Sequence, residues 1–173
     1  MERVHAELAR MLSGAGPYLA LRLLAESGLL RWTKTKLRLP DGLGLMHEAA
    51  EDPLSRLHEA PDAAARWAFW FLRMELGPEE AERTLRALRA SSAFNQDVRR
   101  IMALHGALSG APAEAARKTW ILSVLRHGLP AAESWLPLAE SAAWHPEFRW
   151  AEPYARNGRR WLGEMPVRSV REL

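Results

Sequence analysis

The chain has 173 residues, of which 48% are hydrophobic and 26% are charged, and its net charge is +3. This composition is typical of a folded globular chain of about one domain, which buries roughly two-thirds of its unfolded surface. The absence of cysteine excludes disulfide frameworks, thiolate nucleophiles and cysteine-ligated zinc. No apolar run reaches the ~18–20 residues of a membrane span, and the residues after Met1 do not resemble a signal peptide. We therefore expect a cytoplasmic protein with no membrane partner.

Apolar residues recur at helical spacing along most of the chain, and no segment alternates with the period of two residues that marks a strand. The first predicted helix covers residues 2–12, and the second begins at Pro17 and is interrupted at Gly28. A loop is predicted over residues 33–46, which contain threonine, proline and glycine. A weak helix, interrupted by a proline, is predicted over residues 47–60.

The helices after residue 60 have clear start signals. Asp62 predicts an N-cap for a helix over residues 63–76, and Pro78 opens a helix over residues 78–90. Turns rich in glycine and proline separate three further predicted helices, over residues 94–108, 113–127 and 131–144. The fold class is therefore predicted to be all-α, an irregular array of about eight short helices.

Basic residues are concentrated toward the C-terminal end. Residues 117–173 contain nine basic and six acidic residues, and nearly all basic residues of the chain are arginines. A guanidinium group can hold a phosphate through two hydrogen bonds, although a GC-rich genome produces the same arginine bias. Trp150, Tyr154 and Trp161 are interleaved with the last arginines. Their aromatic rings would either stack on bases or pack in a core. The pattern favours contact with a nucleic-acid backbone, and a solvated, salt-bridged face is the alternative.

Catalytic motifs are missing from the sequence. No two of its four aspartates lie within one helical turn, so no Asp-x-Asp pair is present to hold the two metal ions of nucleotidyl transfer. The six histidines do not occur at zinc-binding spacings, the glycines do not form a phosphate-binding loop, and no serine lies in a nucleophile elbow. We expect a binding scaffold.

Four segments, in order along the chain, are similar to segments of one family. The first two are residues 2–8 and 20–30, which resemble the last neck helices of that family. The third contains Arg66 and Trp67 and is followed by residues 85–91, and it resembles part of a helical body. The fourth, residues 165–173, resembles the start of a tail. The family is the bacterial class II tRNA nucleotidyltransferases of the Bacillus type, which includes CCA-adding enzymes and poly(A) polymerases.

The resemblance implies a piece of a longer enzyme with three parts. These are the end of the neck with its associated helices (residues 1–45), a helical body domain (residues 46–145) and the basic start of a tail (residues 146–173). The catalytic head and the rest of the neck, which would use Mg²⁺ with CTP or ATP, have no counterpart in the sequence. This chain is therefore expected to hold no cofactor and to be inactive alone. Whether the parent adds CCA, CC, A or poly(A) stays open.

By the same resemblance, the expected function is to bind the acceptor–TΨC arm of tRNA during synthesis of the tRNA 3′ end. Glu2, Arg3 and Glu7 would support the nucleotide pocket. The alternative is a helical protein-interaction module that binds no RNA, which the apolar helix at residues 63–76 and the eight tryptophans favour. The candidates for contact with the RNA backbone are Lys118, Arg126, Arg156, Arg159, Arg160, Arg168 and Arg171.

Overall fold

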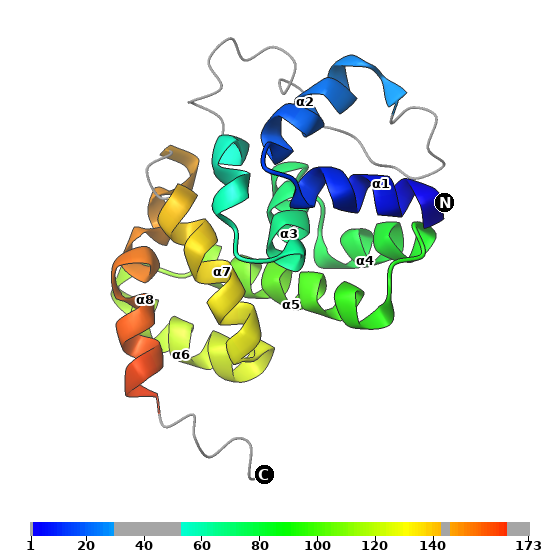
Figure 1. Ribbon diagram of the computed structural model, residues 1–173. Helices are drawn as coiled ribbons and strands as arrows, with labels where there is room; N and C mark the ends of the chain where they lie inside the picture. Colours follow the sequence, from blue (N-terminus) through cyan, green and yellow to red (C-terminus); the bar gives the residue numbers. More distant parts are fainter. Residues whose placement is uncertain (1, 30–52, 143–145, 166–173) are drawn as a thin grey trace.

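The computed structural model describes residues 2–29, 53–142 and 146–165, and within these residues it contains only helices and turns (Figure 1). The all-α prediction is confirmed. None of the helices in these stretches combines the length and the apolarity that a membrane span needs. The 3₁₀-helices are η3 (Pro53–Glu59), η4 (Ala113–Ala115) and η5 (Pro146–Ala151). The eight α-helices of these described stretches are α1 (Glu2–Ser13), α2 (Pro17–Glu26), α3 (Ala63–Arg73), α4 (Pro78–Ala87), α5 (Ser92–Ser109), α6 (Ala116–His127), α7 (Leu129–Ala142) and α8 (Glu152–Glu164).

The predicted helix starts agree well with the structure where the signal is a cap. The Asp62 carboxylate accepts a hydrogen bond from the Ala65 amide at 2.7 Å, and Pro78 is the first residue of α4. Helix α7 begins at Leu129, two residues before the predicted start, because a proline is tolerated in the first turn, where its missing N–H has no helical partner.

Some predictions cannot be compared with the structure, and others differ from it. Outside the described residues lie the predicted loop at residues 33–46, the first part of the weak helix (residues 47–52) and the domain boundary near residue 45. Residue 145, at the second domain boundary, also lies outside them. The described part of the weak helix, Pro53–Glu59, is a 3₁₀-helix. The described part of the expected tail forms η5 and α8, which sequence periodicity did not single out, and α8 packs against α6 and α7.

Helices α3 and α4 end earlier than predicted, and they end in the same way. Glu75 and Arg89 adopt positive φ angles of 57° and 63° just after the two helices. In each case the next amide donates back into the last helical turn, from Leu76 to the Phe71 carbonyl and from Ala90 to the Leu85 carbonyl, each at 3.0 Å. This is the Schellman arrangement, in which the chain turns back while its apolar pattern continues.

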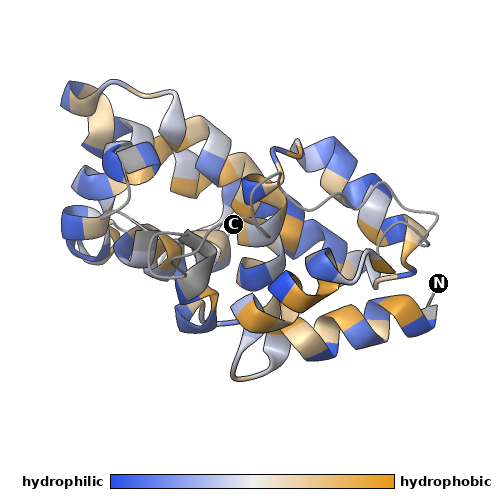
Figure 2. Ribbon diagram, turned by 90° about the horizontal axis from the view of Figure 1, so that it is seen from above, coloured by the Kyte–Doolittle hydropathy of each residue, from blue (hydrophilic) through white to orange (hydrophobic). Residues whose placement is uncertain are grey.

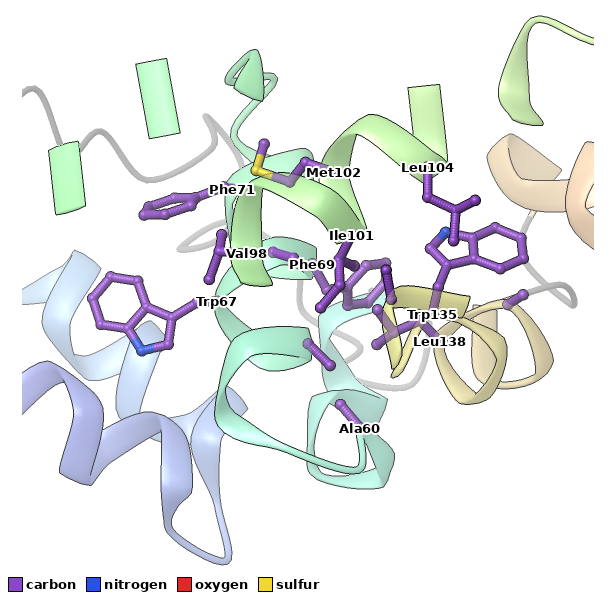
Figure 3. Packing of buried hydrophobic residues seen from close by; sticks show 14 of the residues in the cluster. Ala60, Trp67, Phe69, Phe71, Val98, Ile101, Met102, Leu104, Trp135 and Leu138 are labelled. Atoms are coloured by element: carbon purple, nitrogen blue, oxygen red, sulfur yellow. The ribbon is translucent and has the colours of Figure 1, made fainter. Parts of the chain in front are cut away.

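The core is built around α5, which packs against α3, α4, α6 and α7. Figure 2 shows hydrophobic and hydrophilic residues alternating around the helices, as expected when one face of each helix is buried. In Figure 3 the ring of Trp67 lies on one side of Ile101, and the ring of Trp135 lies on the other. Both tryptophans are buried. Trp67 contacts Phe94 near the start of α5 and Trp135 contacts His105 further along, so large aromatic rings fill the core along this helix.

The Arg66 side chain on α3 connects three separate elements. One Nη atom donates to the Leu12 carbonyl at the end of α1 at 2.7 Å and to the Gly14 carbonyl at 3.3 Å. The other Nη donates to the His58 carbonyl at 3.1 Å, and Nε donates to the Ala60 carbonyl at 3.4 Å. The last carbonyls of a helix have no partner within the helix. Arg66 therefore supplies hydrogen bonds to these chain ends, of which the bonds to Leu12 and Ala60 are partly buried.

We predict that Arg66→Met lowers the free energy of unfolding by about 3 kcal/mol, because carbonyls at the end of α1 and after η3 lose a charged donor. Arg66→Lys recovers only part of the loss, since an ammonium group cannot reach all four carbonyls. Urea denaturation measures both changes. The control is Arg83→Met on the exposed surface of α4, with an expected effect within about 0.5 kcal/mol. Equal effects of Arg66→Met and Arg83→Met would contradict the assigned role.

Helix α8 approaches α7 and α6 closely at Gly158. A Cβ atom at this position would lie 2.5 Å from Leu136 Cδ2 and 3.4 Å from Trp120 Cζ2, and both side chains are buried. In contrast, a Cβ atom at Gly106, on the exposed side of α5, would meet no atom within 4 Å. The two glycines lie in helices of the same core but differ in the space around them.

Gly158→Ala is therefore expected to destabilise the fold by about 1–3 kcal/mol, because the added methyl group overpacks the contact between α8 and Leu136. Gly106→Ala is expected to stabilise it by about 0.5–1 kcal/mol through helix propensity alone. Thermal denaturation of the two variants should shift the melting temperature in opposite directions. A stabilised Gly158→Ala variant would show that α8 does not pack on Leu136 as described.

Candidate nucleic-acid interface

Three of the predicted RNA-contacting arginines share the outer face of α8. Tyr154, Gly158 and Trp161 form the buried face of this helix, so Arg156, Arg159 and Arg160 project from the opposite side. Their side chains are 74%, 66% and 67% exposed. The helical period thus gathers three cations into one exposed stripe.

Each of these arginines has an acidic partner. Arg159 donates from Nε and Nη2 to the two carboxylate oxygens of Glu140 on α7, at 2.7 and 2.8 Å. These hydrogen bonds raise the pKa of the Arg159 guanidinium. Arg156 pairs with Glu152, and Arg160 Nε lies 3.7 Å from Glu164. The stripe is therefore close to electrically neutral in the isolated chain, as the salt-bridged alternative predicted.

Helix α6 lies beside α8 and carries two more of the predicted cations. Lys118 and Arg126 are exposed on α6, and Arg117 Nη2 contacts Glu164 Oε2 of α8 at 2.9 Å. The outward side of α6 also carries Leu122 and Leu125, which are 55% and 59% exposed. The two helices together form a mixed surface of cations, carboxylates and exposed leucines.

The other predicted site residues within the described part of the chain lie on α1. Arg168 and Arg171 lie outside the described residues. Glu2 is the first residue of α1, and Arg3 and Glu7 lie on the same helix, where Glu7 Oε2 accepts from Arg10 Nη1 at 2.9 Å. In Figure 1, α1 and α8 lie on opposite sides of the molecule. The support of a nucleotide pocket by α1 stays a prediction.

The aromatic residues between the arginines pack in the core. Tyr154 and Trp161 are buried, and Trp150 is half-buried with its ring 5.0 Å from the His105 ring. The Tyr154 hydroxyl donates to the Leu108 carbonyl at 3.4 Å, and burial raises its pKa. Of the two readings that the sequence left open for these rings, the structure supports packing, so contact with RNA would involve its backbone.

His105 is the most strongly perturbed titratable group of this core. Its Nδ1 accepts a hydrogen bond from Trp135 Nε1 at 3.2 Å, and its ring makes edge-to-face contacts with Phe148 and Trp150. Burial lowers the pKa of His105 to about 4. The imidazole is therefore neutral at pH 7, where it serves as a hydrogen-bond acceptor in an apolar site.

A cleft of about 380 Å³ lies between the start of α3, one side of α5, the end of α6 and the start of α7. Sequence reasoning did not find it, because its residues come from four helices. The only local signal was Asp62, whose Oδ2 accepts from the Ser134 hydroxyl at 2.6 Å and so ties α3 to α7. Among the described residues, no group of three His, Asp or Glu side chains is arranged to hold a metal ion.

Comparisons with models of known protein families, with curated proteins and with solved structures found no match for this chain. The resemblance to the tRNA nucleotidyltransferases therefore stays a prediction that rests on the quoted segments. The class that the fold defines is an all-α protein.

The pKa of His105 predicts a pH dependence of stability. Between pH 6.5 and about 4 the unfolded chain binds a proton at this histidine and the folded chain does not, so the free energy of unfolding falls as the pH falls. The slope is about 1.4 kcal/mol per pH unit. Above pH 6.5 this contribution is constant.

The test compares urea denaturation of the natural chain and of His105→Gln from pH 7 to pH 4.5. Glutamine keeps an acceptor for Trp135 Nε1 but does not titrate, so the variant should lose stability less steeply as the pH falls. Identical slopes for both chains would contradict a buried, neutral His105.

Proposed function

We propose that this chain is an RNA-binding helical module that holds the acceptor–TΨC arm of tRNA, as part of a tRNA CCA-adding nucleotidyltransferase. Two independent lines support the proposal. The first is the order of the four segments that resemble this family. The second, which carries the proposal, is the stripe of exposed arginines on α8 beside the cations of α6.

The ion pairs on α8 are compatible with phosphate binding. Exposed ion pairs contribute only about 0–1 kcal/mol, because water and salt screen them. A phosphate group accepts the same paired hydrogen bonds from a guanidinium as a carboxylate does, and its binding releases counterions from the RNA. Arg156, Arg159 and Arg160 can therefore exchange their carboxylate partners for phosphates at low cost.

The proposed mode of recognition is by shape. A-form RNA presents phosphates and 2′-hydroxyl groups in a regular array, which a rigid helical surface can match without reading bases. Tyr154 and Trp161 lie beneath the arginines in the core, where they hold α8 in place. In this proposal the rings support the interface from inside, and the guanidinium groups contact the RNA.

In this proposal the nucleotidyl-transfer reaction is carried out by a catalytic head that has no counterpart in this sequence. That head would act on the 3′ end of the bound tRNA, with Mg²⁺ and CTP or ATP. The role of the helical module is to fix the position of the tRNA relative to that head. Such positioning accelerates a reaction because it replaces a bimolecular encounter by a bound, oriented one.

A second candidate function is docking of another protein. The observation that favours it is the exposure of Leu122 and Leu125 on the outward side of α6. Contiguous exposed apolar residues often mark protein interfaces. The response to salt separates the two functions, because phosphate contacts weaken steeply with salt and an apolar interface does not.

The test of RNA binding is a titration with a tRNA acceptor–TΨC minihelix at ~50 and ~200 mM salt, with a DNA duplex of equal charge as competitor. We expect binding that prefers the RNA and weakens with salt. The triple variant Arg156→Gln, Arg159→Gln, Arg160→Gln should bind more weakly. It should also reduce the slope of log affinity against log salt by about 0.9 for each phosphate that the variant no longer neutralises.

The matched control removes three arginines of another surface, as Arg83→Gln and Arg86→Gln on α4, which lies away from α8 (Figure 1), and Arg99→Gln on α5, where the Arg99 side chain contacts Glu82 of α4. It makes the same change in net charge and should retain most of the affinity. Equal losses of affinity in the two triple variants would overturn the placement of the interface on α8. Absence of binding at ~50 mM salt would overturn RNA binding by this chain and favour the protein-docking alternative.

A further inference from the structure

The cleft between α3, α5, α6 and α7 combines an apolar wall with separate charges. Its volume of about 380 Å³ falls in the range of small-molecule sites, which is about 300–1,000 Å³. We define its apolar wall as Phe94 and Ile101 of α5, Ala63 and Ala64 of α3, and Pro130 and Ala131 of α7. Ile101 and Ala131 belong to the buried core, Phe94 and Ala64 pack against it, and Pro130 is exposed at the edge of the cleft.

Two opposite charges line the cleft without neutralising each other. Asp97 and Arg100 are one turn apart on α5, and among the described residues neither of them forms an ion pair or a side-chain hydrogen bond. Residues at this spacing have Cβ atoms about 5–6 Å apart on one side of a helix. By comparison, the neighbouring Arg99 turns to Glu82, 3.6 Å away.

The other polar residues of the cleft already have defined roles. Asp62 accepts hydrogen bonds at both oxygens, from the Ala65 amide and from the Ser134 hydroxyl. Burial, and to a lesser extent the charge of Arg126, lowers the pKa of His127, which favours its neutral form. The charges left for a ligand are therefore one carboxylate and one guanidinium.

We propose that this cleft binds a free α-amino acid with an apolar side chain. The α-carboxylate would accept hydrogen bonds from Arg100, the α-ammonium would donate to Asp97, and the side chain would lie on the apolar wall. The two charged groups of an α-amino acid are attached to one carbon atom, which suits two opposite charges one helical turn apart. The proposal does not rest on RNA binding.

The test is calorimetric titration of the chain, without RNA, with L-leucine, L-leucinamide, N-acetyl-L-leucine and glycine. Leucinamide lacks the carboxylate, acetylleucine lacks the ammonium group, and glycine lacks the apolar side chain. We expect leucine to bind. Each of the other three should bind with an affinity at least about tenfold lower, since each loses one of the interactions described above. No binding of leucine up to roughly 10 mM, which detects millimolar dissociation constants, would overturn the proposal.

Two variants on neighbouring residues make the test specific. Arg100→Gln should bind leucine and leucinamide equally, because the partner of the carboxylate is gone. Arg99→Gln changes the net charge equally but lies outside the cleft, so it should preserve the preference for leucine. A preference for leucine that survives in Arg100→Gln, or that disappears in Arg99→Gln, would overturn the placement of the ligand.

Discussion

The positions of α1 and η3 relative to α3 depend on one side chain, Arg66. Its guanidinium lies where α1 ends and where η3 meets α3, and it donates to carbonyls at both places. The fork of donors on an arginine is flat and rigid, so it sets the relative positions of the acceptors it binds. Because Arg66 precedes Trp67, the same turn of α3 organises the polar chain ends and contributes a large buried ring to the core.

Around this point the fold is a set of short helices held by large aromatic side chains. Short helices have little stability of their own, and most of it comes from packing. Trp67 and Trp70 lie between α3 and its neighbours, and Trp120, Trp135 and Tyr154 join α6, α7 and α8. This packing also explains the arginine stripe, because burial of Tyr154 and Trp161 turns the opposite side of α8 to solvent.

Prediction from sequence succeeded where the signal is local. Asp62 as an N-cap and Pro78 as a first helical residue placed the starts of α3 and α4, because both signals act through atoms within one turn. Prediction from sequence was less successful at the ends of these helices. There the backbones of Glu75 and Arg89 adopt a left-handed conformation, which normally favours glycine. Arg156, Arg159 and Arg160 were chosen for their charge, whereas the helix that places them on one face and their partners Glu140 and Glu164 were not predicted.

The sequence by itself determined the all-α class, the starts of α1 to α4 and the abundance of arginine near its C-terminal end, because periodicity, caps and composition are properties of neighbouring residues. Only the tertiary structure decided that Trp150, Tyr154 and Trp161 pack inward, that Arg66 joins three elements, and that Asp97 and Arg100 face a cleft. These features depend on contacts between residues tens of positions apart, and such contacts are set by how the helices pack on one another.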